Sequence, residues 1–146
     1  MKQAGDVKLS VKRPFTASAQ RVFDAFLDPT KAGQFMFATA TGKMVRVAID
    51  ARVGGTYVFV DRRDGEDVEH AGEYLEIERP RRLVFTLRVA KYSTDQSVVT
   101  IEIVPRGTGC ELTLTQTVSA AFAEHLQRIE AGWGAILDHA ATVIGA

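Results

Sequence analysis

Two ionisable side chains in the stretch EHAGEYLEI, His70 and Glu73, have the types and spacing best suited to acid–base chemistry. Imidazole and carboxylate groups transfer protons efficiently when burial or nearby charges move their pKa toward the working pH. Neither alternate set of residues along this stretch is uniformly apolar, and we interpret Gly72 as the mark of a β-bulge. If the bulge turns His70 or Glu73 inward, that side chain is a candidate general base. Otherwise both lie on an exposed outer face.

Gln116 is a further polar side chain whose role needs explaining, because it continues the apolar strand face of Leu112 and Leu114. A buried amide without a partner costs about 1–3 kcal/mol, so its hydrogen bonds must be made somewhere. Two interpretations stay open. Gln116 is either an anchor that orients a ligand, with Tyr74 as a second orienting group, or a glutamine satisfied by local backbone or water.

The sequence lacks the residues for a reactive cysteine, a helical metal site or a phosphate-binding loop. Cys110 lies among leucines on the same apolar face, where a thiol behaves as a small hydrophobe with a raised pKa. His125 and His139 have no second ligand-type residue one helical turn away, so we predict no metal site. The segment RVGGT lacks the lysine and the following helix of a phosphate-binding loop, and we expect no cofactor.

The hydrophobic pattern indicates the elements that must position these residues. Alternating apolar and polar residues over about 7–14 predict a half-buried strand. The segment SAQRVFDAFLDP has a helical apolar stripe between a capping Ser18 and Pro29, and a second short helix is expected over 30–35. From 44 to 118 the pattern predicts six strands in a meander, separated at RVGG, RDGE, ERPRR and PRGTG.

The last segment of the chain has the pattern of one long amphipathic helix. Its single tryptophan, Trp133, lies between Gly132 and Gly134, which let a backbone or a bulky side chain approach the helix closely. Apolar residues recur at steps of three and four, at Phe122, Leu126, Ile129, Trp133, Ile136, Leu137, Ala140 and Ile144. The elements together predict an α+β helix-grip fold: a curved antiparallel seven-stranded sheet wrapped around a long C-terminal helix, with two short helices after the first strand.

Composition limits the classes of partner and location. The 146 residues, 46% of them hydrophobic, suit one domain spanning 1–146. Eighteen basic residues balance eighteen acidic ones, which disfavours nucleic acid and anionic membranes as partners. A single cysteine and an N-terminus without an apolar stretch favour the cytoplasm.

Six segments in this order resemble the START-like (SRPBCC) superfamily, and within it the branch related to the activator of the heat-shock ATPase chaperone. They are PFTASAQRVFDAFLDP, IDARVGG, HAGEYLEIERPRRLVFTL, SVVTIEI, CELTLTQT and AGWGAILDH. The resemblance implies a helix-grip fold with an internal cavity, often used to hold an apolar or amphipathic small molecule. Members of the branch usually carry tryptophan where this chain has residues 34–37, and many have histidine in place of Gln116.

We interpret the protein first as a binder of a small hydrophobic or amphipathic molecule in a cavity between the C-terminal helix and the sheet. The ligand-binding residues expected are Phe35, Phe37, Tyr57, Phe59, His70, Tyr74, Phe85, Gln116, Trp133 and Leu137. The first alternative is a cyclase- or hydrolase-type enzyme that uses His70 or Glu73. The second is a chaperone-associated interaction module, which the threonine- and glutamate-rich outer strand faces disfavour. A homodimer is compatible with each of these functions.

Overall fold

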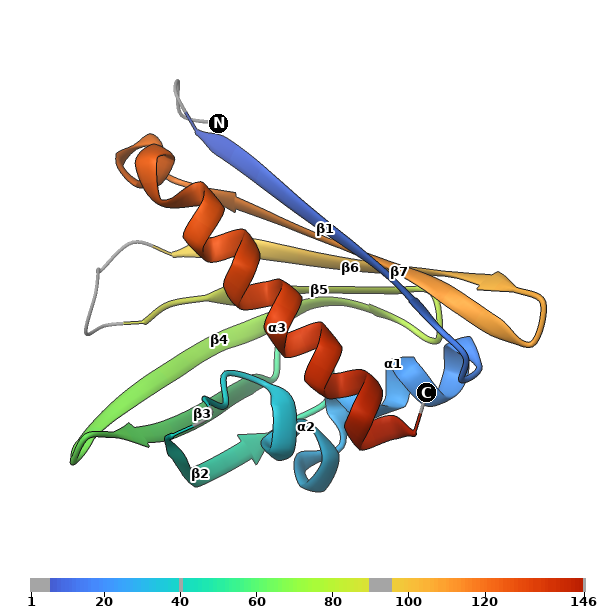
Figure 1. Ribbon diagram of the computed structural model, residues 1–146, viewed down its shortest axis with the longest axis horizontal. Helices are drawn as coiled ribbons and strands as arrows, with labels where there is room; N and C mark the ends of the chain where they lie inside the picture. The colour runs from blue at the N-terminus through green and yellow to red at the C-terminus, as the bar shows by residue number, and fades with distance from the viewer. Residues whose placement is uncertain (1–5, 40, 90–95, 146) are drawn as a thin grey trace.

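The computed structural model describes residues 6–39, 41–89 and 96–145, and these adopt the predicted helix-grip fold (Figure 1). The elements in chain order are β1 (Val7–Phe15), α1 (Ala19–Leu27), α2 (Pro29–Phe35), β2 (Lys43–Ile49), β3 (Thr56–Arg63), β4 (Glu66–Glu78), β5 (Arg82–Leu87), β6 (Ser97–Arg106), β7 (Gly109–Val118), the 3-10 helix η1 (Ala120–His125) and α3 (Leu126–Ile144). Over the described ranges, the strands form one seven-stranded antiparallel sheet in the order β1-β7-β6-β5-β4-β3-β2.

The sheet curves around α3, which crosses its inner face, while α1 and α2 lie near the C-terminal end of α3 (Figure 1). Strand β7 shows why the sheet has one covered face. Cys110, Leu112 and Leu114 are buried, whereas Thr113 and Thr115 between them are only half-buried on the outer face. The period of two in the sequence therefore sets which face packs on the helices.

Local turn and cap chemistry fixes the ends of several elements. Asp64 and Gly65 have φ values of 51° and 79°, as the predicted tight β3–β4 hairpin requires. Ser18 caps α1 by accepting a hydrogen bond from the backbone N–H of Arg21 at 3.3 Å. Pro29 does not simply end that helix, because Asp28 then caps α2 and Pro29 is its first residue.

The predicted bulge in β4 lies three residues from the expected position. The register shifts between Tyr74 and Glu76, not at Gly72. A Cβ at Gly72 would lie 1.8 Å from the carbonyl oxygen of Thr86, so this glycine is where β4 approaches the β5 backbone closely. The alternation N-terminal to the shift turns His70 and Tyr74 inward and leaves Glu73 exposed on the outer face.

Helix α3 is buried along only half of its length. Trp133, Leu137, Ala140 and Ile144 are buried, but nothing in η1 is, and Leu126 and Ile129 of α3 are only half-buried. The chain after Ser119 also begins as a 3-10 helix, where the sequence pattern predicted one continuous helix. In the described part of the chain, no helix combines the length and apolar character that a bilayer span needs.

Candidate functional site

All ten side chains predicted to bind a ligand are buried. They come from six parts of the fold: α2 and the loop after it, β3, β4, β5, β7 and α3. The structure brings most of them together, but Phe35 belongs to a different contact, since its ring packs edge-on against Phe26 of α1 at 5.2 Å. Phe35 therefore holds the two short helices together.

Four rings form a cluster beneath the middle of α3, and we call Phe37, Phe59, His70 and Trp133 the ring cluster. The Phe37 ring lies parallel to the His70 imidazole, with centroids 4.3 Å apart and an interplanar angle of 12°. Phe59 and Trp133 each meet Phe37 edge-on at 5.6 Å. Phe37 is thus the central member, and it contacts the other three rings.

A second group of rings lies deeper in the sheet. Tyr57 contacts Phe59, Tyr74 and Phe85 with centroids 5.5–5.8 Å apart. The cavity here has a volume of only about 10 Å³, and its lining residues are Phe26, Met36, Tyr57, Phe59, Tyr74, Leu83 and Phe85. This is about the space of one water molecule, so an organic ligand needs some of these side chains to move.

Phe37 has a backbone conformation that bulky residues rarely adopt. Its φ is 59°, in the left-handed region, where strain of about 1–3 kcal/mol is typical and must be offset by surrounding contacts. The contacts are the ring stack on His70 and a hydrogen bond of 3.1 Å from Arg63 Nη2 to the Phe37 carbonyl oxygen. Sequence patterns do not reveal this conformation, because phenylalanine carries no turn signal.

An ion pair that sequence reasoning missed lies next to Phe37. Asp61 is fully buried, and its Oδ2 accepts hydrogen bonds from Arg63 Nε and Thr39 Oγ1, both at 2.8 Å. Its other oxygen, Oδ1, is buried without a hydrogen-bond partner. The alternation of Tyr57 and Phe59 places Asp61 on the inner face, and that signal was available in the sequence.

Gln116 makes its hydrogen bonds inside the protein. Its Oε1 accepts from Trp133 Nε1 at 2.7 Å, and its Nε2 donates to Ser97 Oγ at 2.8 Å. Ser97 in turn donates to the carbonyl oxygen of Leu87 at 3.3 Å. The partners of Gln116 are thus two side chains distant in sequence, not the local backbone or water of the second interpretation, and the amide positions Trp133.

His70 is the one candidate base that the structure places inside. Burial and the nearby Arg63 guanidinium lower the pKa of His70 to about 4, so the ring is neutral at pH 7. Its Nδ1 lies 3.4 Å from the carbonyl oxygen of Phe59. Glu73 is exposed on the outer face, so the proposal of Glu73 as an internal base is wrong for this structure.

The tyrosine hydroxyls of the deeper group differ in their partners. Tyr57 donates its hydroxyl to the Thr86 carbonyl oxygen at 2.7 Å, and burial raises its pKa. Burial, with a smaller effect of Asp50, also raises the pKa of Tyr74. Both hydroxyls therefore stay protonated at neutral pH, and the interior near the ring cluster carries no phenolate charge.

The glycines beside Trp133 have different surroundings. A Cβ at Gly134 would lie 2.7 Å from Nη2 of Arg13, whose Nε also donates to Asp138 at 2.9 Å. A Cβ at Gly132 would meet no atom within 4 Å. Gly134 therefore makes room for a guanidinium, not for a backbone, and Gly132 faces open space.

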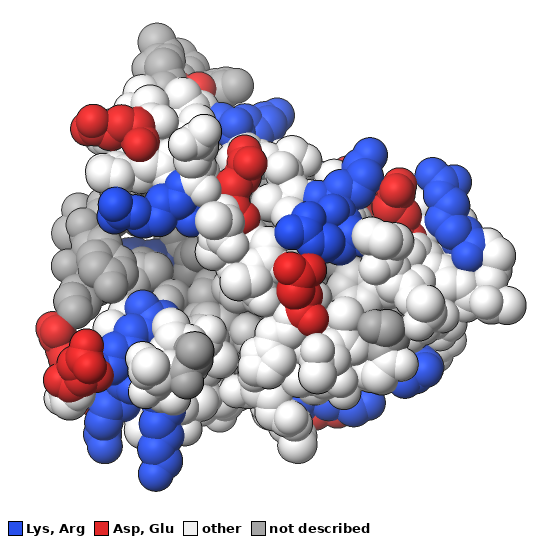
Figure 2. All heavy atoms as spheres, viewed as in Figure 1, with Lys and Arg blue, Asp and Glu red and all other residues white. Residues whose placement is uncertain are grey.

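None of residues 120–132, at the start of α3 and before it, is buried, and we call this segment the open end. Figure 2 shows the surface hollowed here, between this segment and the β3–β4 hairpin. Leu126 and Ile129 are half-buried above the hollow side of the core. A separate groove of about 540 Å³ lies between α3 and β1, lined by polar and small residues from Ser10 to Arg13 and from Gln127 to Asp138.

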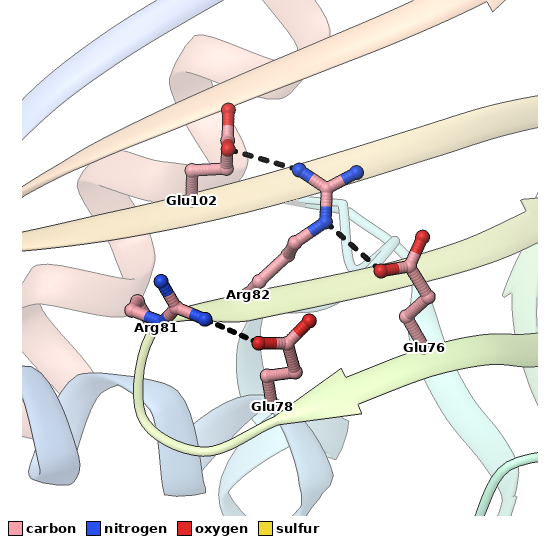
Figure 3. A network of polar contacts seen from close by, with 5 residues as sticks. All are labelled: Glu76, Glu78, Arg81, Arg82 and Glu102. Carbon is pink, nitrogen blue, oxygen red and sulfur yellow. Dashed lines mark hydrogen bonds and ion pairs between the residues drawn. The ribbon is translucent and has the colours of Figure 1, made fainter.

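The outer face of the sheet carries charges that pair with one another. Figure 3 shows Arg82 between Glu76 and Glu102, with N–O distances of 3.1 and 2.9 Å, and Arg81 paired with Glu78. The four other side chains are exposed and Arg82 is half-buried, so each pair contributes little to stability. The outer face in this region carries both signs of charge.

The described residues contain no group of three histidine, cysteine, aspartate or glutamate side chains that could hold a metal ion. Cys110 is buried and free, and burial raises its pKa. A nucleophilic or metal-binding function for this thiol has no support in its surroundings.

The comparisons agree with this architecture. A family described as "Activator of Hsp90 ATPase homolog 1-like protein" matches residues 16–145. Protein CV1439 from Chromobacterium violaceum superposes with a TM-score of 0.83 at 25% identity, over 95% of this chain and 97% of that one. Protein NE0264 from Nitrosomonas europaea superposes with a TM-score of 0.82 at 20% identity, over 95% of this chain and 94% of that one. An AHSA1-like protein from Aeromonas hydrophila superposes with a TM-score of 0.82 at 19% identity, over 95% of this chain and 92% of that one. Among proteins with curated descriptions, none matches this chain in sequence.

Proposed function

We propose, from the premise that the chain belongs to the activator of Hsp90 ATPase homolog 1-like family, that it binds a small hydrophobic or amphipathic molecule. The site is the ring cluster, between α3 and the inner face of the sheet. Members of the wider superfamily typically bind ligands, and the fold of this chain matches theirs. The chemistry of the cluster indicates which class of ligand it would accept.

The observation that carries the proposal is the convergence of four rings from separate parts of the fold beneath the middle of α3. Rings from the loop after α2, β3, β4 and α3 converge there, while the helix above them is only half-buried. Ligand sites commonly occupy such concave, ring-lined positions.

The chemistry of the cluster favours an uncharged ring system. His70 is neutral at pH 7, and the amide of Gln116 is already bonded to Trp133 and Ser97. The four members of the ring cluster offer a charged group no partner of opposite sign, and such a group would lose its hydration on binding there. A planar apolar molecule can stack on His70 and meet the edge of Trp133, as Phe37 does now.

Titration with N-phenyl-1-naphthylamine, a neutral fluorescent probe, tests the proposal. We expect saturable probe fluorescence with energy transfer from Trp133, and amide shifts at Phe37, His70 and Trp133 in two-dimensional NMR. Residues of the outer face, such as Thr100 and Glu102, provide the control because they are remote from the proposed site. Absence of saturation, or shifts confined to the outer face, would contradict the proposal.

A second candidate function, a cyclase- or hydrolase-type enzyme, keeps one supporting observation. His70 is neutral at pH 7 and part of the ring cluster, so its ring can accept a proton there, but its pKa of about 4 makes it a weak base. Hydrolysis of uncharged aryl esters, compared between the wild type and His70→Gln, tests this function. Equal rates in the two proteins would exclude catalysis by His70.

The chaperone-associated function has no comparable support. The family is described by its likeness to an activator of the Hsp90 ATPase, and that activity belongs to the protein so described. Docking on a chaperone would need a contiguous apolar or single-sign patch. The outer charges shown in Figure 3 instead pair with one another. A pulldown with purified chaperone would decide the question.

A further inference from the structure

We propose that Phe37 is the side chain that gives way to a ligand, and that the Asp61–Arg63 ion pair is the positioning element that keeps it in place. The inference rests on the ligand site proposed above. It adds the residue that moves and the residues that control the movement.

The ring of Phe37 occupies the space where a planar ligand would bind. It stacks on His70 at 4.3 Å and contacts the edges of Phe59 and Trp133, so one molecule of similar shape could replace it. The other three rings are carried by strands or by a helix, whereas Phe37 lies in the loop between α2 and β2. It is therefore the member whose displacement disturbs no regular hydrogen-bonded element.

The backbone of Phe37 favours its departure. Its φ of 59° is strained for a side chain of this size, and rotation to negative φ would release that strain. Something must oppose the release for the observed state to persist. The ring contacts are one such interaction, and a ligand that stacks on His70 would replace them.

The Asp61–Arg63 pair supplies an interaction that a ligand does not replace. Arg63 donates one hydrogen bond to Asp61 Oδ2 at 2.8 Å and another to the Phe37 carbonyl oxygen at 3.1 Å. The guanidinium thus ties the backbone of the loop to β3. Asp61 is itself held by Thr39 Oγ1, and its carboxylate lies against Gly42, where a Cβ would come within 2.5 Å of Oδ2.

The burial of Asp61 also supports a positioning role for the Asp61–Arg63 pair. The carboxylate is completely buried and one of its oxygens has no partner, an arrangement that costs stability compared with an apolar residue. Its observable effect is to orient Arg63, which in turn fixes the Phe37 carbonyl group. A buried pair that adds little to stability but fixes one conformation is expected to act through that conformation.

The double variant Asp61→Asn, Arg63→Gln removes both charges and so leaves neither one buried and unpaired. The matched control is Arg62→Gln, Asp67→Asn, which removes an exposed pair between β3 and β4 whose Nε–Oδ1 distance is 2.7 Å. In ligand-free protein we expect the His70 ring protons of the first variant to lose the ring-current shift caused by Phe37. We also expect acrylamide quenching of Trp133 to rise about two-fold or more. The control should match the wild type in both measurements.

Titration of the same proteins with N-phenyl-1-naphthylamine separates this inference from the proposed function. We expect the Asp61/Arg63 variant to bind the probe about ten-fold more tightly than the wild type. If the His70 shift and the quenching change but no protein binds the probe, the proposed function fails and the role of the pair stands. If the wild type binds the probe and the variant changes neither measurement nor affinity, the role of the pair is overturned.

Arg63→Lys keeps the test decisive if the double variant does not fold. A lysine retains a positive charge beside Asp61 but cannot reproduce the planar two-donor geometry of the guanidinium. We expect increased quenching of Trp133 at wild-type thermal stability within a few degrees. Wild-type quenching in this variant, with the Phe37–His70 shift unchanged, would also overturn the inference.

Discussion

The indole Nε1 of Trp133 donates a hydrogen bond of 2.7 Å to the side-chain oxygen of Gln116, and both residues are buried. Through Gln116 Nε2, Ser97 and the Leu87 carbonyl oxygen, this bond connects α3 to β7, β6 and β5. This continuous chain of hydrogen bonds links the helix to three strands of the sheet. Such a chain fixes the rotamer of the tryptophan that the ring cluster contains.

Replacing Gln116 with leucine should leave the buried Trp133 N–H without a partner. The expected loss in unfolding free energy is about 1–3 kcal/mol, measured by urea denaturation. The fluorescence of Trp133 should also shift to shorter wavelength, because its indole loses a polar contact. Thr117→Val, one residue away on the outer face, is the control and should change stability by less than about 0.5 kcal/mol. Equal effects of the two changes would contradict the role of the bond.

Two glycines should respond to alanine in opposite directions. Gly132 lies within a helix and a Cβ there meets no atom within 4 Å, so Gly132→Ala should raise stability by about 0.5–1 kcal/mol. A Cβ at Gly72 would overlap the Thr86 carbonyl oxygen, so Gly72→Ala should prevent folding or lower stability by several times that amount, roughly 3 kcal/mol or more. Thermal unfolding followed by circular dichroism measures both. A stabilised Gly72→Ala protein would show that β4 and β5 are further apart than described.

Stability should fall as the solution is acidified from pH 6.5 toward pH 4, in part because of His70. Its pKa is about 4 in the folded protein and about 6.5 when unfolded, so the unfolded state binds the proton more readily. The contribution of neutral His70 to the unfolding free energy is fully present above about pH 6.5 and is lost as the pH approaches 4. The total loss is about 3 kcal/mol at most. Urea denaturation at several pH values should show a shallower pH dependence for His70→Gln than for the wild type. Parallel curves would mean that His70 is accessible to water.

The thiol of Cys110 should react with Ellman's reagent far more slowly in the native protein than in urea. It lies on the inner face of β7, and burial both shields it and raises its pKa. The native rate should follow the rate of opening of β7, and added stabilisation by Gly132→Ala should slow it further. Rapid labelling of the native protein at pH 8 would contradict the described packing of β7.

The architecture was predictable from the sequence because periodicity and turn chemistry are local signals. Alternation placed Cys110 and Leu112 inward, and Asp64 with Gly65 identified a hairpin whose φ values the structure confirms. The bulge in β4 was assigned to the wrong residue, since a glycine within a strand can mark either a bulge or a close backbone approach. It marks a close backbone approach here, and the register shift lies after Tyr74.

The site was only partly predictable. Burial of the ten expected residues follows from their positions on inward faces, so pattern reasoning was sufficient for it. The stacking of Phe37 on His70 could not be predicted, because it depends on a left-handed backbone conformation that phenylalanine does not favour. Asp61 and Arg63 follow the same alternation as Tyr57 and Phe59. A charged residue at an inward position contradicts the apolar pattern of that face, however, unless the ion pair that accommodates it is known. The cavity volume depends on side-chain packing at the scale of 1 Å.

The unequal burial of α3 has a consequence for how such a protein can diversify. Substitutions in the half that begins at Trp133 alter the interior on which folding depends, whereas residues 120–132 have few buried atoms to lose. New specificities can therefore arise by drift in the exposed half while the remainder stays constant. Proteins with a ligand site of the proposed kind would then share one scaffold and still differ in what they recognise.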